Sequence, residues 1–175
     1  MTTLHFTVVG VPVPKGSTRA FVPKGWSRPI ITNDNPKTKG WQQLVAEEAS
    51  RAIQTLPGGV FHVLDTGVRL TVAFYLPRPK KFQKRGTNPP HLTKPDLDKL
   101  LRAVKDALKS VAWHDDSQVV DVVAMKRYAG IDDVPHAEIW IEPTESVVAL
   151  ARAQKLFAPP PPPALKKPLF ADPGF

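Results

Sequence analysis

The sequence has no cysteine among its 175 residues. Disulfides, thiolate zinc sites, iron–sulfur clusters and cysteine nucleophiles are therefore excluded, so any metal ion must bind oxygen or imidazole ligands. Long hydrophobic runs are also lacking: no stretch approaches the roughly 18 consecutive apolar residues of a membrane-spanning helix, and the N-terminus lacks the pattern of a signal peptide. We therefore expect a cytoplasmic protein with no membrane partner.

Acidic residues are missing from two long stretches of a chain that is basic overall, with 24 Lys and Arg, 16 Asp and Glu, and a net charge of +8. Residues 1–33 contain the basic residues Lys15, Arg19, Lys24 and Arg28. Residues 78–95 contain Arg78, Lys80, Lys81, Lys84, Arg85 and Lys94. Such charge favours polyanionic partners such as nucleic acid, although a solvated loop would explain either stretch taken alone.

Hydrophobic periodicity and the placement of proline and glycine predict six regular elements. Strands are expected over residues 4–9, 68–76, 118–128 and 136–142, and helices over residues 37–54 and 96–110. This order of strand, helix, strand, helix, strand, strand predicts an α+β fold, with a mixed β-sheet packed by two main helices. Residues 10–19 and 77–95 are expected to be loops because prolines and glycines interrupt any periodicity.

We expect one domain over residues 1–143, because a chain of this size with 42% apolar residues can build one ordinary core. Residues 144–175 include five consecutive prolines at 159–163 and are expected to form an extended or disordered tail. Two tail segments, AQKLF and KKPLF, resemble short peptides that bind the replication sliding clamp. Stray hydrophobic residues in a disordered tail are the simpler explanation of them.

Four aspartates stand out in this basic chain. Asp96 and Asp98 open the second predicted helix, and Asp115 and Asp116 precede the third predicted strand. Carboxylates brought together could share a hard cation such as Mg²⁺, with open positions for water and a phosphate. The alternatives are structural: Asp96 would cap the helix, the other pair would form a turn, and Arg102 would only pair with Asp98 one helical turn away.

Two motifs combine basic residues with aspartate or with proline and glycine. Residues 94–128 read KPDLDKLLRAVKDALKSVAWHDDSQVVDVVAMKRY, with an acidic pair opening a helix, a basic residue along it and a DDxQ segment entering a strand. Residues 10–21 read GVPVPKGSTRAF, a loop of the pattern Gly-x-Pro-x-Pro-Lys-Gly-x-x-Arg. Both motifs resemble those of the RusA family of Holliday junction resolvases. Together the matches run across about residues 4–143, in the family's order and spacing.

The resemblance implies a homodimeric endonuclease that makes paired nicks across a four-way DNA junction with Mg²⁺ or Mn²⁺, in the host cytoplasm if the chain is phage-encoded. It also implies that Asp96, Asp98 and Asp116 bind the metal, with Asp115 able to exchange roles with Asp116. Two residues depart from the family: Lys99 stands where Asn is common, and Arg102 where the best-known members have an essential Lys. Arginine keeps the positive charge but cannot act as a general acid, because it does not lose its proton at accessible pH.

The expected reaction is in-line attack on the scissile phosphate by a water that one or two Mg²⁺ ions activate, with Arg102 stabilising the developing negative charge. Sequence-independent phosphate contacts are expected from Lys15, Arg19, Lys80, Lys81, Lys84, Arg85, Lys94 and Lys126. For Lys126, an exposed lysine at a strand end is an equal alternative. Trp26, in a basic loop, is a candidate for stacking on DNA bases. Two other functions stay open: cleavage of other branched DNA such as forks, flaps or packaging intermediates, and a catalytically degenerate DNA-binding module.

Overall fold

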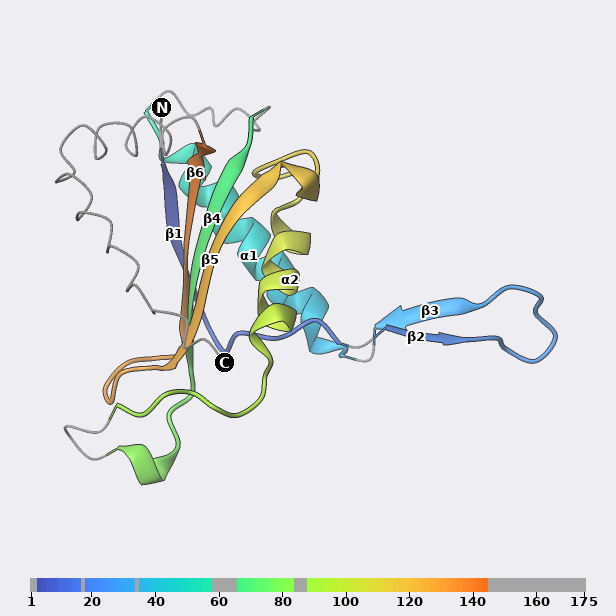
Figure 1. Cartoon of the computed structure of the whole chain (residues 1–175), viewed down its shortest axis with the longest axis horizontal. Helices are drawn as coiled ribbons and strands as arrows, with labels where there is room; N and C mark the ends of the chain where they lie inside the picture. The colour runs from blue at the N-terminus through green and yellow to red at the C-terminus, as the bar shows by residue number, and fades with distance from the viewer. Residues whose placement is uncertain (1–2, 17, 34, 58–65, 84–87, 145–175) are drawn as a thin grey trace, which may run out of the picture.

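The computed structural model describes residues 3–16, 18–33, 35–57, 66–83 and 88–144. Its main body is a mixed four-stranded sheet in the order β1-β6-β4-β5. Strand β6 pairs antiparallel with both β1 and β4, whereas β4 and β5 are parallel. The predicted α+β fold, with two main helices on a mixed sheet, is confirmed (Figure 1).

The sheet and helix bounds follow the sequence patterns closely. The strands of the main sheet are β1 (Leu4–Val9), β4 (Val68–Leu76), β5 (Val119–Tyr128) and β6 (His136–Pro143). The main helices are α1 (Lys37–Gln54) and α2 (Leu97–Leu108). Strand β1 alternates buried and exposed residues, as a strand with one covered face should.

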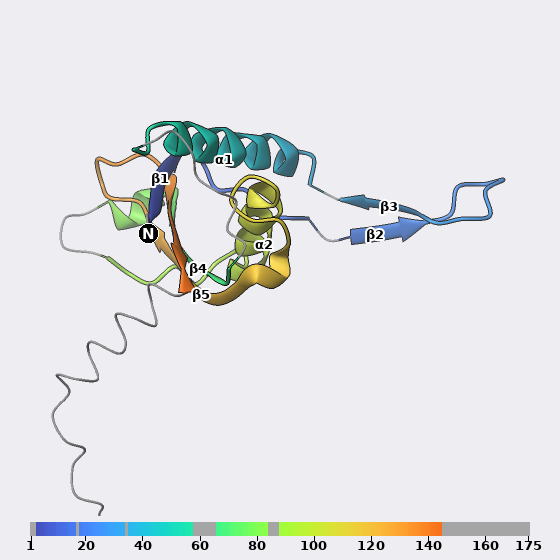
Figure 2. The ribbon, with the colours of Figure 1, turned by 90° about the horizontal axis from the view of Figure 1, so that it is seen from above.

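Both helices lie on the same face of the sheet, as the view from above shows (Figure 2). The core between these two layers combines branched and aromatic side chains from the sheet with the apolar faces of the helices; its largest fully buried members include Trp113, Phe74, Leu70, Leu100 and Ile139. Helix α2 connects the parallel strands β4 and β5. Asp96 lies directly before its first residue, and Asp115 and Asp116 lie in the connection from its last turn to β5.

The structure corrects the prediction that residues 10–19 form only a loop. Strand β2 (Thr18–Phe21) pairs antiparallel with β3 (Ile30–Asn33) in a separate two-stranded sheet. This hairpin projects away from the body of the protein in both views (Figures 1 and 2). Periodicity missed it because each strand has only four residues and a loop rich in proline and glycine separates them.

The predicted loop of residues 77–95 is largely irregular but includes the 3-10 turn η1 (Lys80–Phe82). Arg78 joins this segment to the residue that follows β5, because its guanidinium donates to the carbonyl oxygens of Ala129 and Phe82 at 2.7 and 3.1 Å. His91, which is buried, packs its ring 4.4 Å from that of Tyr128. The described parts of this loop are thus fixed to the end of β5.

Some predictions fall on residues outside the described ranges. These are the tail beyond residue 144 with its sliding-clamp segments, the basic residues Lys84 and Arg85, and the side chain of Arg19. Within the ranges described, no helix is long and apolar enough to cross a membrane.

Candidate active site

Asp96 occupies the N-cap position of α2, as predicted, but its side chain makes no capping hydrogen bond. Its nearest ionic partner is the ammonium of Lys99, 3.5 Å from a carboxylate oxygen. The capping explanation for this aspartate therefore does not hold. Its carboxylate stays available for another role at the entrance to the helix.

Asp98, in the first turn of α2, lines a cavity of about 400 Å³. The other residues of this cavity, called here the acidic cavity, are Leu101, Arg102, Lys105, Asp106 and Asp116. Asp98 and Arg102 are one helical turn apart, yet no ion pair joins them among the described residues. The side chains are thus not committed to each other, and the cavity contains carboxylates beside two cations.

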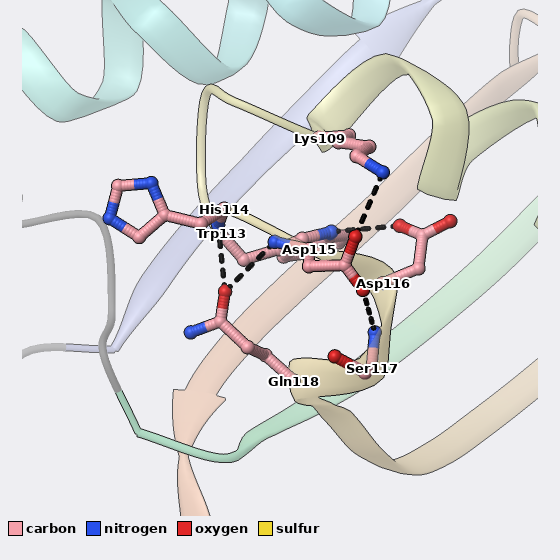
Figure 3. Close-up of polar contacts among 7 residues, drawn as sticks. All are labelled: Lys109, Trp113, His114, Asp115, Asp116, Ser117 and Gln118. Atoms are coloured by element: carbon pink, nitrogen blue, oxygen red, sulfur yellow. Dashed lines mark hydrogen bonds and ion pairs between the residues drawn. The ribbon is translucent and has the colours of Figure 1, made fainter.

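A buried tryptophan holds Asp116 in place. The Nε1–H of Trp113, whose side chain is fully buried, donates to one carboxylate oxygen of Asp116 at 3.0 Å (Figure 3). Asp116 opens the short 3-10 turn η2 (Asp116–Gln118), so both its backbone and its side chain are fixed. The sequence pattern alone predicts no role for Trp113. The only signal was a tryptophan three residues before an aspartate, which many surface turns would also show.

The carboxylate of Asp115 has different hydrogen-bond and ion-pair partners from that of Asp116. Asp115 caps η2 in a capping box: its carboxylate accepts from the Ser117 N–H at 3.0 Å, and the Gln118 side chain accepts from the Asp115 N–H at 3.0 Å (Figure 3). A second carboxylate oxygen lies 3.0 Å from the ammonium of Lys109. The Ser117 amide first, and Lys109 next, lower the pKa of Asp115 below its ordinary range. The adjacent aspartates therefore have distinct surroundings and are not equivalent.

Asp96 does not share the acidic cavity. It lines a second cavity of about 610 Å³, here called the entrance cavity, together with Lys15, Lys94 and Lys99. The predicted common cage of Asp96, Asp98 and the 115–116 pair is thus not assembled, and the described residues contain no group of three acidic or histidine side chains placed to hold one ion. Asp96 precedes α2 with an extended backbone at φ −71° and ψ 139°, whereas Asp98 lies in the first helical turn, and their side chains line different cavities.

Lys15 links the two cavities. Its backbone N–H donates to the Lys99 carbonyl at 2.9 Å, and its ammonium forms an ion pair with Asp106 at 2.5 Å. Its charge is therefore partly neutralised at the edge of the acidic cavity. A direct contact to DNA phosphate by Lys15 stays a prediction, but the structure shows that it also fastens the β1–β2 connection to α2.

Lys126 has a role that neither prediction for it foresaw. Its ammonium, half-buried on β5, donates to the carbonyl oxygens of Thr93 and Pro95, each at 2.9 Å. It is therefore more than an exposed lysine, because it fixes the segment that leads into Asp96, and a contact to DNA phosphate by Lys126 stays a prediction. The other predicted DNA contacts that the structure describes, Lys80, Lys81 and Lys94, have exposed side chains.

The donor set suits a hard divalent cation. Asp98 has no recorded partner among the described residues, and Asp116 has one oxygen that the indole does not use. Mg²⁺ is commonly bound by one or two carboxylates together with substrate phosphate and water, rather than by a complete protein cage. Three carboxylates line the acidic cavity, and one of them, Asp106, is paired with Lys15. The other two, Asp98 and Asp116, therefore fit Mg²⁺ in the presence of DNA.

Comparisons with known proteins agree with the motifs. The profile of the endodeoxyribonuclease RusA family matches residues 10–142, which is more than half of the chain. The chain is also 34% identical over 151 residues to the uncharacterised protein YqaN of Bacillus subtilis strain 168, a match that covers 81% of this chain and 96% of that relative. The chain therefore belongs to the RusA endodeoxyribonuclease family, which indicates an endonuclease that acts on Holliday junctions.

Proposed function

We propose that this protein is a Mg²⁺-dependent homodimer, with Mn²⁺ as a substitute metal, that resolves Holliday junctions by paired symmetric nicks during DNA recombination and repair. The observation that carries the proposal is the acidic cavity, where Asp98 and Asp116 lie beside Arg102. Two symmetric nicks need two such sites, which a dimer related by a two-fold axis supplies.

We propose Asp98 and Asp116 as ligands of one metal ion in the acidic cavity, and Asp96 as a ligand of a second ion in the entrance cavity. Asp96 is included because its carboxylate makes no capping hydrogen bond. The chemistry that bound Mg²⁺ supplies in such a site is neutralisation of the phosphate charge and acidification of water. Asp115 we propose as a positioning residue, because its capping and ion-pair contacts shape the turn that presents Asp116.

The chain's own residues would orient the DNA and stabilise charge. The Arg102 guanidinium, on the wall of the acidic cavity, would bind the phosphate oxygens as negative charge grows in the transition state. It would not donate a proton to the leaving oxygen, since arginine remains charged. The exposed lysines of the 77–95 segment would bind neighbouring phosphates, so affinity should fall steeply with salt concentration.

Asp98→Asn and Asp116→Asn provide the direct test, on a labelled four-way junction with Mg²⁺. Each substitution should abolish cleavage while junction binding is retained or strengthened, because a carboxylate that repels phosphate has been removed. Asp132→Asn is the matched control. Asp132 is exposed on the β5–β6 loop, and the variant protein should cleave the junction like the wild type. A fully active Asp98→Asn protein, or undiminished cleavage in excess EDTA, would refute the metal site. Sedimentation velocity on the wild type tests the dimer.

One observation favours a second candidate, the noncatalytic DNA-binding module. The Lys99 ammonium lies 3.5 Å from Asp96 and competes with any cation for that carboxylate. Specific junction binding without nicking in Mg²⁺ or Mn²⁺ would support this candidate. Cleavage of forks and flaps as fast as four-way junctions would instead assign the enzyme to branched DNA in general.

A further inference from the structure

The projecting hairpin carries an exposed tryptophan at its tip. Trp26 is 63% exposed, and the loop of residues 22–29 that contains it lies beyond the paired strands β2 and β3. The backbone turns there through a Trp26 N–H to Pro23 carbonyl bond of 3.0 Å and through Gly25 at φ 91°, a conformation that suits glycine. The indole is thus presented to solvent rather than packed into the body of the protein.

The charge around this tryptophan is of one sign. Lys24 and Arg28 are both exposed in the same loop, and no acidic residue precedes position 34 in the sequence. Neither side chain has a recorded ionic partner among the described residues. Aromatic faces combined with lysine and arginine are the elements with which proteins bind unpaired nucleotides, the ring stacking on a base and the cations binding phosphate.

The base of the hairpin is fastened beside the two cavities. The Pro14 carbonyl, before β2, accepts from the Asn35 side chain at 3.1 Å and from the Thr38 hydroxyl at 3.0 Å, which joins the two ends of the hairpin at the start of α1. The next residue, Lys15, is bonded to the first turn of α2 through Lys99. The strands then extend for about 13 Å before the tip loop. The arm therefore starts from residues that line the entrance cavity, and it reaches outward from the body of the protein (Figure 1).

We propose that this hairpin is a branch-sensing arm, in which Trp26 stacks on an unstacked base at the junction crossover while Lys24 and Arg28 bind the flanking phosphates. Bases within an intact duplex are stacked on both faces, and exposing one costs energy that an already disrupted position does not require. The arm would thus favour branched over linear DNA. This inference rests on the proposed function for its substrate class.

A second copy of the chain is a poorer occupant for the tip. A symmetric contact would bring two identical loops together, and each carries lysine and arginine with no acid nearby. Their mutual repulsion opposes that contact, whereas the same charges attract a DNA backbone.

The test measures binding by the full chain in EDTA, so that cleavage plays no part. Trp26→Ala should weaken binding to a four-way junction by about 10-fold, within the roughly 5- to 150-fold range expected for loss of one stacked base, with a smaller effect on linear duplex of the same length. Trp26→Phe should recover most of the affinity, because its ring can still stack. The control is Ile131→Ala, another exposed apolar residue (42%) on the β5–β6 loop, which should bind both DNAs normally.

Fluorescence supplies an independent measurement. The emission of Trp26, taken as the difference between wild type and Trp26→Phe, should be quenched by saturating junction but not by saturating duplex. Equal losses of affinity for the two DNAs, unchanged junction affinity in Trp26→Ala, or a lost dimer in sedimentation velocity would each overturn the proposal. Because binding is read in EDTA, a protein that senses the branch but never nicks DNA would refute the nuclease proposal and leave this one standing.

Discussion

Replacing Trp113 with phenylalanine should separate its packing role from its hydrogen bond to Asp116. The phenyl ring keeps most of the buried aromatic volume but removes the Nε1–H donor, which lies 3.0 Å from the carboxylate. A hydrogen bond to a charged group contributes about 1.5–3 kcal/mol. Because Asp116 is only half-buried, water can replace part of that bond, and we expect a loss of about 1–2 kcal/mol from the hydrogen bond alone.

Trp41→Phe is the matched control, because Trp41 is a second buried tryptophan whose indole N–H makes no hydrogen bond in the described structure. Trp41 is 4% exposed. The substitution removes the same ring volume from the same core without breaking a bond, and it also removes a buried unsatisfied donor. Since such a donor costs about 1–3 kcal/mol, Trp113→Phe should lower the free energy of unfolding by at least about 1 kcal/mol more than Trp41→Phe does.

Urea unfolding followed by far-ultraviolet circular dichroism measures both variants without relying on tryptophan emission. Junction cleavage across a Mg²⁺ titration measures the site: Trp113→Phe should need more Mg²⁺ for half-maximal rate, because the Asp116 carboxylate is no longer held, whereas Trp41→Phe should match the wild type. Equal stabilities and equal Mg²⁺ requirements in the two variants would show that the indole does not position Asp116.

Two further substitutions test the supporting contacts. The lowered pKa of Asp115 means that its contribution to stability is present above the unfolded value of about 3.9 and is lost as pH falls towards the folded pKa. Asp115→Asn should therefore reduce the stability difference between pH 6 and pH 3 in urea unfolding, whereas Asp132→Asn should not; equal pH dependence in both would contradict the assignment. Lys126→Met should lower the cleavage rate and the unfolding free energy, by about 1–3 kcal/mol for two charged hydrogen bonds, with the exposed Lys39→Met as control. Rates and stabilities matching that control would rule out a positioning role for Lys126.

Local pattern was sufficient for most elements of the main body. The alternation of β1 and the apolar face of α2 predicted their positions because burying one side of an element imposes a period on its sequence. The β2–β3 hairpin lacked that signal, because each of its strands has only four residues. A short projecting arm is therefore the type of element that periodicity misses.

The acidic site was predicted in composition but not in arrangement. Asp96 and Asp98 were correctly placed at the start of a helix, yet the sequence could not say that they line different cavities, because this depends on what packs around α2. The same limit applied to Asp115 and Asp116. Their difference arises from Lys109 and Trp113, which reach them only once the chain between α2 and β5 has folded.

By itself, then, the sequence determined the chemistry available to this protein: oxygen ligands without thiols, basic segments suited to phosphate, and the motifs of one endonuclease family. Tertiary structure alone decided how those groups are used. It places Asp98 with Asp116 and not with Asp96, bonds Lys126 to the segment that enters α2, and extends Trp26 on an arm. The physical reason is that residue type fixes charge and donor capacity, whereas distance and burial, which decide pairing, depend on packing between segments far apart in the chain.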